Sequence, residues 1–377
     1  MAKAKVSIVR CPDYSDKSVL RAVREAIDLL GGMNAFVRPG DRVLLKPNLL
    51  SAKDPERAVT THPSVVKAII QLVVDAGGIP MVGDSPSIGS LVKVASKAGI
   101  YDVVREMNCT LVAFDDAVEV KRLHQGVFTK VEVAAAVMDS DLVINLPKLK
   151  THGMTTMTLS VKNVFGCIPG TKKIQWHLRA GVNRDYFAQM LVDIYGIVRP
   201  RLNVVDAVVG MEGDGPSAGN PRKIGLIFAG SDGIAVDSTI CRVLDLPPRS
   251  LLTNRIGSDL GLGTSRAEDI EVVGEGLDEV RVKDFHFPRS ADPHWGLPGP
   301  LRWLLRNSLT AKPSIRRDVC KLCGICVEGC PPGAMTRVNE RIEVDYSKCI
   351  RCFCCSEFCP EGAVGIRKGW PQRIFGR

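Results

Sequence analysis

The sequence predicts an α/β protein, in which helices cover both faces of a parallel or mixed sheet, followed by a small α+β domain rich in cysteine. Over residues 1–285, short apolar runs of strand length alternate with amphipathic segments of helical length. This alternation is typical of a sheet that is covered by helices. Nine of the 13 cysteines then fall within residues 320–359. We therefore divide the chain into an α/β domain at 1–285, a linker rich in proline and tryptophan at 286–313, and a cysteine-rich domain at 314–377.

The pattern of apolar residues places the elements of the first domain. Pro63 suits the first turn of a helix, and Gly77 with Gly78 ends that helix. Short apolar runs bounded by turn residues predict the strands. The predicted strands are residues 5–9, 41–46, 79–82, 141–145, 202–209 and 223–229, and residues 114–133 are predicted to form inserted antiparallel strands. The predicted helices are residues 16–30, 61–76, a segment that ends at residue 98, 184–198 and 232–244.

The cysteines of the last domain follow one spacing twice. The pattern C-x2-C-x2-C-x3-C-P begins at Cys320 and begins again, 29 residues later, at Cys349. In this pattern three thiolates at short spacing bind one [4Fe–4S] cluster, and the fourth cysteine binds the other cluster. The sequence therefore predicts two [4Fe–4S] clusters. The ligands assigned to the first are Cys320, Cys323, Cys326 and Cys359, and those assigned to the second are Cys349, Cys352, Cys355 and Cys330.

A disulfide scaffold and paired zinc ribbons are the alternatives for these cysteines. Disulfides require an oxidising compartment, to which nothing in the sequence points. Zinc sites use C-x2-C pairs separated by a longer spacer, and not a triple followed by C-x3-C-P. The additional thiol of Cys354 is interpreted as a small apolar residue. With all eight ligand positions matched, residues 314–368 resemble the two-[4Fe–4S] ferredoxin family.

The composition excludes several classes of protein. A hydrophobic content of 45% and a charged content of 24% are ordinary for a globular domain. Most of the net charge of +9 lies in residues 286–377, where it offsets cluster charge; no nucleic-acid motif accompanies it. No apolar run reaches the length of a membrane span, and residues 301–306 are predicted to pack between domains and not to insert into a membrane. Since no apolar leader precedes the first strand, we expect a cytoplasmic protein in a reducing, anaerobic setting.

Polar side chains gather where the predicted strands end. In open α/β sheets, ligands bind beyond the carboxyl ends of the strands. If these side chains converge they form a site for a carboxylate or phosphate, since lysine binds such groups as a point charge. The alternative is that each lysine is an ordinary solvated loop residue. The predicted substrate-binding residues are Lys46, Asn48, Asn145, Lys148, Lys150, Lys162 and Asn163.

A histidine and several acids add to this site. His152 is placed to donate a proton, and Lys150 is the other candidate catalytic residue, although a lone histidine is usually structural. His62 precedes Pro63 and is interpreted as local to its helix start. Asp206 and Glu212 could pair with a lysine, bind a hard cation or act as a base, whereas Asp214 is interpreted as an ordinary turn residue.

Familiar nucleotide motifs are absent from the sequence, but a second resemblance is present. There is no G-x-G-x-x-G after a strand and no phosphate loop, so neither a nicotinamide nor a nucleotide triphosphate is supported. The motifs at residues 46–48, 61–63, 83–85, 146–152, 160–163 and 213–216 together resemble the family called domain of unknown function 362, over about residues 40–245. This resemblance implies an α/β domain that often carries a C-terminal two-cluster ferredoxin, and it implies no substrate.

Three hypotheses about function follow. The leading one is an iron–sulfur oxidoreductase that exchanges electrons with a redox partner protein, a ferredoxin or an oxidoreductase, and with a small anionic substrate or cofactor in the cationic cleft of the α/β domain. The second is a non-catalytic electron carrier, whose large domain docks onto a separate oxidoreductase through its lysines. The third is a non-redox enzyme in which the clusters are structural.

Overall fold

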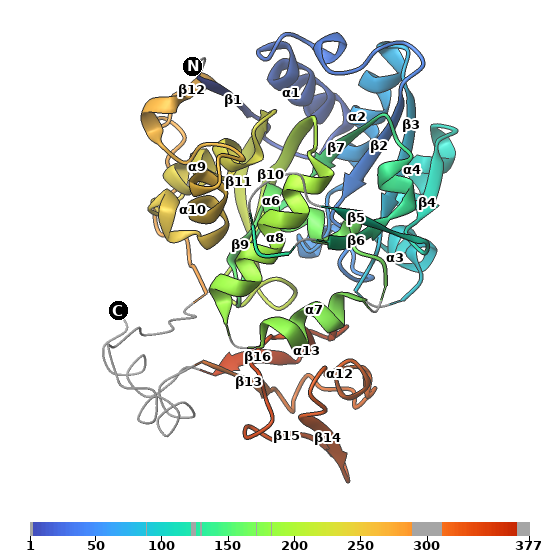
Figure 1. The fold of residues 1–377 in the computed structure, drawn as a ribbon, viewed down its shortest axis with the longest axis vertical. Coiled ribbons are helices and arrows are strands. Elements are labelled where there is room, and N and C mark those ends of the chain that lie inside the picture. Colours follow the sequence, from blue (N-terminus) through green and yellow to red (C-terminus); the bar gives the residue numbers. More distant parts are fainter. Residues whose placement is uncertain are drawn as a thin grey trace.

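The large domain is built on a ten-stranded mixed sheet (Figure 1). The computed structural model describes residues 3–87, 89–121, 126–128, 130–170, 172–181, 183–288 and 311–367. Along the main path of the sheet, β11 runs antiparallel to both of its neighbours and the remaining pairs are parallel. The predicted fold class is therefore confirmed. The order of the path is β12 (Ile270–Gly274), β1 (Ala4–Arg10), β11 (Asn220–Gly230), β10 (Leu202–Glu212), β7 (Leu142–Leu146), β2 (Arg42–Pro47), β3 (Ile79–Asp84) and β4 (Thr110–Ala113).

Helices cover both faces of this sheet. Val43 and Leu45 of β2 pack with the helices of one face, whereas Leu44 between them belongs to the core of the other face. Successive side chains of a strand point to opposite faces, so the consecutive apolar residues Val43, Leu44 and Leu45 of β2 need cover on both faces. The first face carries α1 (Asp16–Asp28), α2 (Pro63–Asp75), α3 (Leu91–Lys97) and α4 (Ile100–Glu106). The second carries α8 (Arg184–Val198) and α9 (Gly233–Val243), with α10 (Leu252–Asp259) packed against them.

The helix ends show where sequence signals succeeded and where one was missed. The ring of His62 accepts a hydrogen bond from the Ser64 amide at the start of α2, the local role expected for it. The helix predicted to end at residue 98 ends at Lys97, with Ala98 as its cap, and a second helix, α4, begins at Ile100. Gly99 separates the two with a φ of +71°, and an added Cβ would also lie 3.3 Å from Pro63 Cγ. The left-handed turn at this glycine is what divides one apolar stretch into two helices.

The predicted insertion is a separate two-stranded antiparallel sheet. It consists of β5 (Ala117–Lys121) and β6 (Lys130–Ala134), followed by the short helix α5 (Ala135–Met138). Elements that the sequence analysis missed lie close to the candidate site. They are β8 (Lys148–His152), β9 (Thr156–Thr158), α6 (Ser160–Asn163) and α7 (Lys172–Ala180).

The cysteine-rich domain lies beside α7, at one end of the large domain (Figure 1). Its strands β13 (Lys312–Ile315) and β16 (Val364–Arg367) pair, as do β14 (Met335–Val338) and β15 (Arg341–Val344). Its helices are α12 (Ile325–Glu328) and α13 (Cys354–Phe358). The prediction for residues 301–306, and most of the predicted linker at 286–313, lie outside the described residues. Among the helices that are described, none has the length and apolar character needed to cross a bilayer.

Candidate functional site between the two domains

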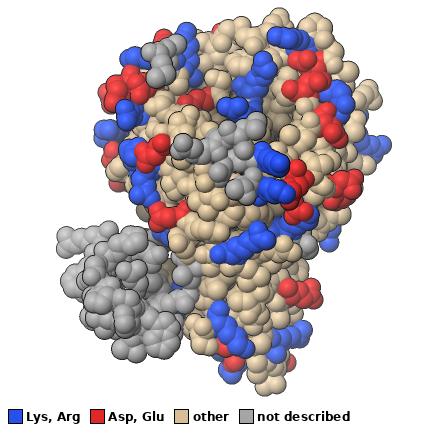
Figure 2. Space-filling view, in the orientation of Figure 1, with Lys and Arg blue, Asp and Glu red and all other residues tan. Residues whose placement is uncertain are grey.

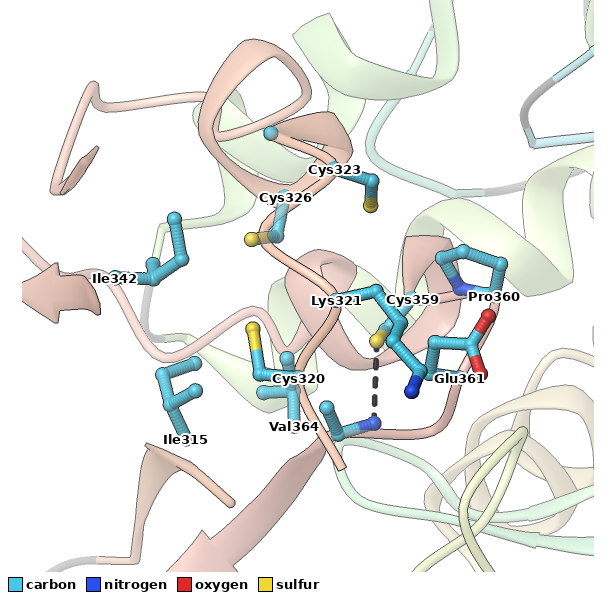
Figure 3. Close-up of a pocket in the computed structure, with 12 residues that line it drawn as sticks. Ile315, Cys320, Lys321, Cys323, Cys326, Ile342, Cys359, Pro360, Glu361 and Val364 are labelled. Atoms are coloured by element: carbon cyan, nitrogen blue, oxygen red, sulfur yellow. Dashed lines mark hydrogen bonds between the residues drawn. The ribbon is translucent and has the colours of Figure 1, made fainter. Parts of the chain in front are cut away.

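The eight predicted ligand cysteines surround two separate pockets. One pocket, with about 350 Å³ of empty volume, is lined by Cys320, Cys323, Cys326 and Cys359, with Ile315, Ile342 and Val364 beside them (Figure 3). The other, with about 300 Å³, is lined by Cys330, Cys349, Cys352 and Cys355. We call these the outer and the inner cage. Each cage thus takes three cysteines from one repeat and its fourth from the other, which is the grouping that the spacing predicted.

The backbone of the two cages repeats with the sequence. Leu322 and Arg351, 29 residues apart, both have a φ of +56°, and the next such pair is Gly324 (+81°) and Phe353 (+59°). Positive φ at residues other than glycine costs energy and persists only where the surroundings fix it. The Ala334 amide donates to Cys330 Sγ at 3.2 Å, and the Ala363 amide donates to Cys359 Sγ at 3.1 Å. Amide donors directed at sulfur are typical of iron–sulfur sites, where they stabilise thiolate charge and tune the potential.

Four sulfurs around an apolar volume fit a [4Fe–4S] cluster. All 13 cysteines are free thiols in the structure. Within the described ranges, no three His, Cys, Asp or Glu side chains converge closely enough to hold a single metal ion. A four-iron cluster binds each thiolate through a different iron, so its ligands enclose a volume and need not converge on one point.

The two cages differ in their position relative to the large domain. Cys323 of the outer cage is exposed, whereas Cys349, Cys352 and Cys355 of the inner cage are buried. Cys352 packs with Ile174 of α7, and the Phe353 ring lies against Gly153 of the large domain, where an added Cβ would lie 3.4 Å from Phe353 Cδ2. The large domain therefore packs against the inner cage, whereas Cys323 leaves part of the outer cage exposed.

The hairpin β8–β9 and the helix α6 place lysines opposite the inner cage. Because side chains alternate along a strand, Lys148, Lys150 and His152 of β8 share one face. Thr158 of β9 pairs with Lys150 across the hairpin, so their side chains are neighbours. α6 begins two residues after Thr158. The amides of Ser160 and Val161, at the start of α6, donate hydrogen bonds to the buried carboxylate of Asp237. This short connection brings Lys162 next to Lys150.

Lys148 does not join the pocket, contrary to the prediction. Its Nζ donates to Asp206 Oδ2 at 2.8 Å and to the Tyr14 hydroxyl at 2.7 Å, and its side chain is 1% exposed. The register of β8 against β10 pairs Lys148 with Asp206 directly, and this fixes the ion pair. Burial lowers the pKa of Lys148, and the charge of Asp206 opposes that change. Lys148 is therefore a structural cation.

Lys46 lies in the pocket but is already paired. Its Nζ donates to Asp84 Oδ1 at 2.7 Å, and the other oxygen of Asp84 accepts from the Leu49 amide at 2.7 Å. Gly166 packs directly on this pair, since an added Cβ would meet Asp84 Oδ1 at 2.2 Å and Lys46 Nζ at 2.5 Å. Only glycine allows this close approach of the backbone.

The interdomain pocket itself combines lysines of the large domain with an acid of the cysteine-rich domain. It has about 420 Å³ of empty volume, and Lys150, Lys162 and Lys173 line it together with Glu357 of α13. Figure 2 shows surface Lys and Arg interspersed with Asp and Glu over one face of the molecule. The pocket lysines are a different set, because Lys150 and Lys173 are buried and Lys162 is half-buried. Burial lowers the pKa of Lys150 to about 7 and that of Lys173 to about 8.

A row of amides holds Lys150 in place. Lys150 Nζ donates to Asn48 Oδ1 at 2.9 Å and to the Val59 carbonyl. Asn48 Nδ2 donates to Asn163 Oδ1, and Asn163 Nδ2 donates to Asn145 Oδ1, each at 2.8 Å. Asn48 and Asn163 line the pocket as predicted, but Asn145 lies behind them and supports Asn163.

His152 bridges the two domains. Its Nδ1 accepts from the Met154 amide at 3.0 Å, so its Nε2 carries the proton and donates to Glu357 Oε1 at 2.8 Å. Burial lowers the pKa of His152, so the ring is neutral. Burial alone would raise the pKa of Glu357, but the hydrogen bond from His152 and the charge of Lys162 outweigh it and hold that pKa below its usual range. His152 thus orients a carboxylate, a role different from the predicted proton donor to substrate.

Comparison with known proteins places the large domain in a family. The model of the family described as domain of unknown function (DUF362) matches residues 43–242, more than half of the chain. The chain belongs to the DUF362 family. A 4Fe-4S dicluster domain matches residues 312–360 of this DUF362 protein. Thylakoid-associated protein sll1697 from Synechocystis sp. is 41% identical over 298 residues, covering 79% of this chain and 92% of the relative.

Two solved structures show limited similarity to the chain. The lactate racemase apoprotein from Thermoanaerobacterium thermosaccharolyticum has a TM-score of 0.39 at 11% identity, over 62% of this chain and 55% of that one. A protein from Thermotoga maritima has a TM-score of 0.38 at 11% identity, over 67% of this chain and 60% of that one. The DUF362 chain therefore spans less than two thirds of either protein.

Glu357 is the main residue of this DUF362 site that sequence reasoning missed. Glu357 is the middle one of the three residues between Cys355 and Cys359. Glu328 lies at the equivalent position of the other repeat. Glu357 is 4% exposed, whereas Glu328 is exposed. Only the docking of the domains distinguishes the two, so no pattern in the sequence could select one of them.

Glu357→Gln is expected to destabilise the cluster-loaded DUF362 protein by about 1.5–3 kcal/mol, because it weakens a charged hydrogen bond and leaves the pocket lysines without their carboxylate. The matched change Glu328→Gln is expected to stay within about 0.5 kcal/mol, since that side chain is exposed. Anaerobic denaturant titration of both variants measures the difference. Equal effects of the two changes would show that the interdomain contact of Glu357 is not significant for stability.

Proposed function

We propose that this protein transfers electrons through two [4Fe–4S] clusters, one in each cage, to or from a small anion held in the interdomain pocket. The observation that carries the proposal is the position of Glu357. This residue lines the pocket and belongs to the loop that runs from an inner-cage ligand, Cys355, to an outer-cage ligand, Cys359. The loop therefore joins both cages to the pocket over a few covalent bonds. The dicluster family match supports iron–sulfur binding in this domain.

The clusters would supply one-electron transfer, and the residues of the chain would define its path. The outer cage exposes Cys323, where a redox partner protein can approach. The inner cage packs against the large domain, which excludes water from the side that faces the pocket. Lys150 and Lys162 attract the anion, while the amide row and His152 fix the positions of Lys150 and Glu357. We propose a reducing, cytoplasmic setting for this reaction, because the cages require free thiols.

An electron carrier without a substrate of its own is the second candidate. The exposure of Cys323 favours it, because a carrier needs only one accessible cluster edge. In this case the lysines of the pocket would serve the contact between the domains, and a separate oxidoreductase would perform the chemistry.

The test begins with anaerobic purification and the quantitation of iron and sulfide, followed by a reductive titration observed by EPR and absorbance. We expect about eight irons per chain and two reducible clusters. Zinc, or far less iron after careful reconstitution, would overturn the proposal. A further optical species would reveal another cofactor and favour the enzyme. Capture of one stoichiometric oxidoreductase by salt-sensitive binding would favour the carrier.

The binding of an anion in the pocket is expected to weaken as the pH rises through about 7. Lys150, whose pKa burial lowers to about 7, is charged below that pH and attracts the anion, and it is neutral above it. The charged groups that face it are Glu357, Lys162, Lys148 and Asp84. One titrating lysine changes the affinity by at most about tenfold per pH unit. Calorimetric titration of sulfate, whose own charge is constant over this range, at pH 6, 7 and 8 measures the trend, and an affinity independent of pH would contradict the role of Lys150.

A further inference from the structure

Two groups of the interdomain pocket have no hydrogen-bond partner among the described residues. Thr158 lines the pocket, is 4% exposed, and its Oγ1 neither donates nor accepts a hydrogen bond there. The Nζ of Lys162 also makes no hydrogen bond or ion pair within the described part of the chain. Buried polar groups in native proteins are almost always partnered. Thr158 is such a buried group, and the half-buried ammonium of Lys162 lines the same pocket without a counter-ion in the described ranges, so the two together indicate a ligand that accepts hydrogen bonds.

The surroundings of Lys162 show which charge that ligand carries. The ammonium lies 4.6 Å from the centre of the Phe165 ring and 5.7 Å from that of Phe187, contacts that leave its N–H donors unused. The other lysines already have acceptors, since Lys46 binds Asp84, Lys150 binds Asn48, and Lys173 binds Ser85 and Pro86. Four lysines in the pocket face two carboxylates, those of Asp84 and Glu357. The excess positive charge selects an anion, and the hydroxyl of Thr158 adds one neutral donor.

The same ammonium is close to the inner cage. Lys162 and Glu357 line the same pocket, and Glu357 belongs to α13, which also carries the inner-cage ligand Cys355. Cys354 packs with the inner-cage ligand Cys352 in one apolar cluster. In this water-poor region charges interact more strongly than they do in bulk solvent. An anion on Lys162 and an electron in the inner cage are therefore two negative charges in one low-dielectric region.

We propose that the interdomain pocket binds a small oxyanion or carboxylate through Lys162 and Thr158, and that this anion binds more weakly once the inner cluster is reduced. The inference rests on the proposed function, because it requires a cluster in the inner cage. The electron comes from the low-potential donor protein that approaches the outer cage, and it adds one negative charge to the inner cage. No covalent bond changes. Reduction thus promotes release of the anion, and oxidation promotes its binding.

Linkage makes this coupling reciprocal. If reduction weakens anion binding by a given factor, a saturating anion lowers the reduction potential of the inner cluster by the equivalent amount. We expect a factor of about tenfold, which for one electron corresponds to about 59 mV. The outer cluster should shift less, because the contacts of the large domain with Cys352 and Phe353 are made at the inner cage.

The experiment is a potentiometric EPR titration of the cluster-loaded full chain with saturating phosphate, with acetate, and with chloride at equal ionic strength. Comparison of phosphate and acetate distinguishes an oxyanion ligand from a carboxylate ligand. Thr158→Val and Lys162→Met test the site. Lys172→Met is the matched control, since it removes a neighbouring charge that pairs with Glu132 outside the pocket. Calorimetry on the oxidised and the reduced protein then measures the affinities directly.

We expect one of the two reduction potentials to fall by about 59 mV when phosphate or acetate is added to the wild type or to Lys172→Met. The shift should vanish in Lys162→Met and decrease in Thr158→Val. A shift that persists in both pocket variants, or that chloride reproduces, would overturn the site. If both clusters are intact but no anion changes their reduction potentials, this inference is wrong and the proposed function is not affected. Failure to find the clusters would instead refute the proposed function.

Discussion

Asp206→Ala is expected to lower the free energy of unfolding by about 3–5 kcal/mol. Asp206 is fully buried and accepts hydrogen bonds from Tyr14 Oη at 2.7 Å, Lys148 Nζ at 2.8 Å and the His62 amide at 2.9 Å. Without the carboxylate, the ammonium of Lys148 stays buried with only the Tyr14 hydroxyl beside it. Removing one member of a buried ion pair is costly for this reason, although the intact pair need not stabilise the fold greatly.

A double mutant separates the charge from the packing. Lys148→Met in the Asp206→Ala background removes the isolated cation, so we expect the double mutant to be more stable than Asp206→Ala alone. Asp259→Ala is the control, because its partner Arg249 and Asp259 itself are both exposed, and such pairs contribute at most about 1 kcal/mol. Denaturant titration of these three variants and of the wild type measures these differences. If Asp206→Ala and Asp259→Ala cost the same, the buried cluster is not a significant source of stability.

Cys330→Ala is expected to remove the inner cluster and to leave the outer one. The cysteine lies in the first repeat by sequence, but it lines the inner cage together with Cys349, Cys352 and Cys355. We therefore expect the iron content to fall from about eight to about four per chain. The remaining EPR signal should match that of Cys349→Ala and differ from that of Cys326→Ala. If each cluster instead took its four ligands from one repeat, Cys330→Ala would match Cys326→Ala.

Cys354→Ala is the matched control for this experiment. Cys354 is buried beside Cys355 but lines neither cage. Its replacement should leave the iron and sulfide contents unchanged. Loss of a cluster in this variant would show that Cys354, and not Cys355, is the ligand.

The sequence predicted most strongly what depends on short-range geometry. Repeats at fixed spacing determine which cysteines can share a cage, because each loop wraps around its own cage and reaches the other through its fourth cysteine. The cover of both sheet faces by helices was also predictable, since consecutive apolar residues such as Val43, Leu44 and Leu45 of β2 require it. The division between α3 and α4 was missed, because periodicity alone does not show that Gly99 adopts a left-handed conformation.

The lysine site shows the limit of reasoning from sequence. Lys148 and Lys150 stand two residues apart on one face of β8, so the pattern treats them as equivalent. The register of β8 against β10 pairs Lys148 with Asp206, whereas Lys150 lines the pocket. No residue pattern near these lysines predicts this long-range pairing. Glu357 is a contact between domains, and Lys173 lies on a helix that was not predicted. Glu357 reaches the pocket only through the docking of the cysteine-rich domain, whereas Lys173 is held there by Ser85 and Pro86 of the large domain.

The loop that contains Glu357 has a consequence for the maturation of the protein. One wall of the pocket belongs to a helix whose ends are held by cage cysteines, Cys355 and Cys359, and metal-site ligands commonly become ordered only when their cofactor is inserted. A freshly synthesised chain that has not received iron and sulfide would therefore lack a finished pocket. If the proposed function holds, cofactor delivery would come first and anion binding second, so a chain without its clusters would not sequester the anion.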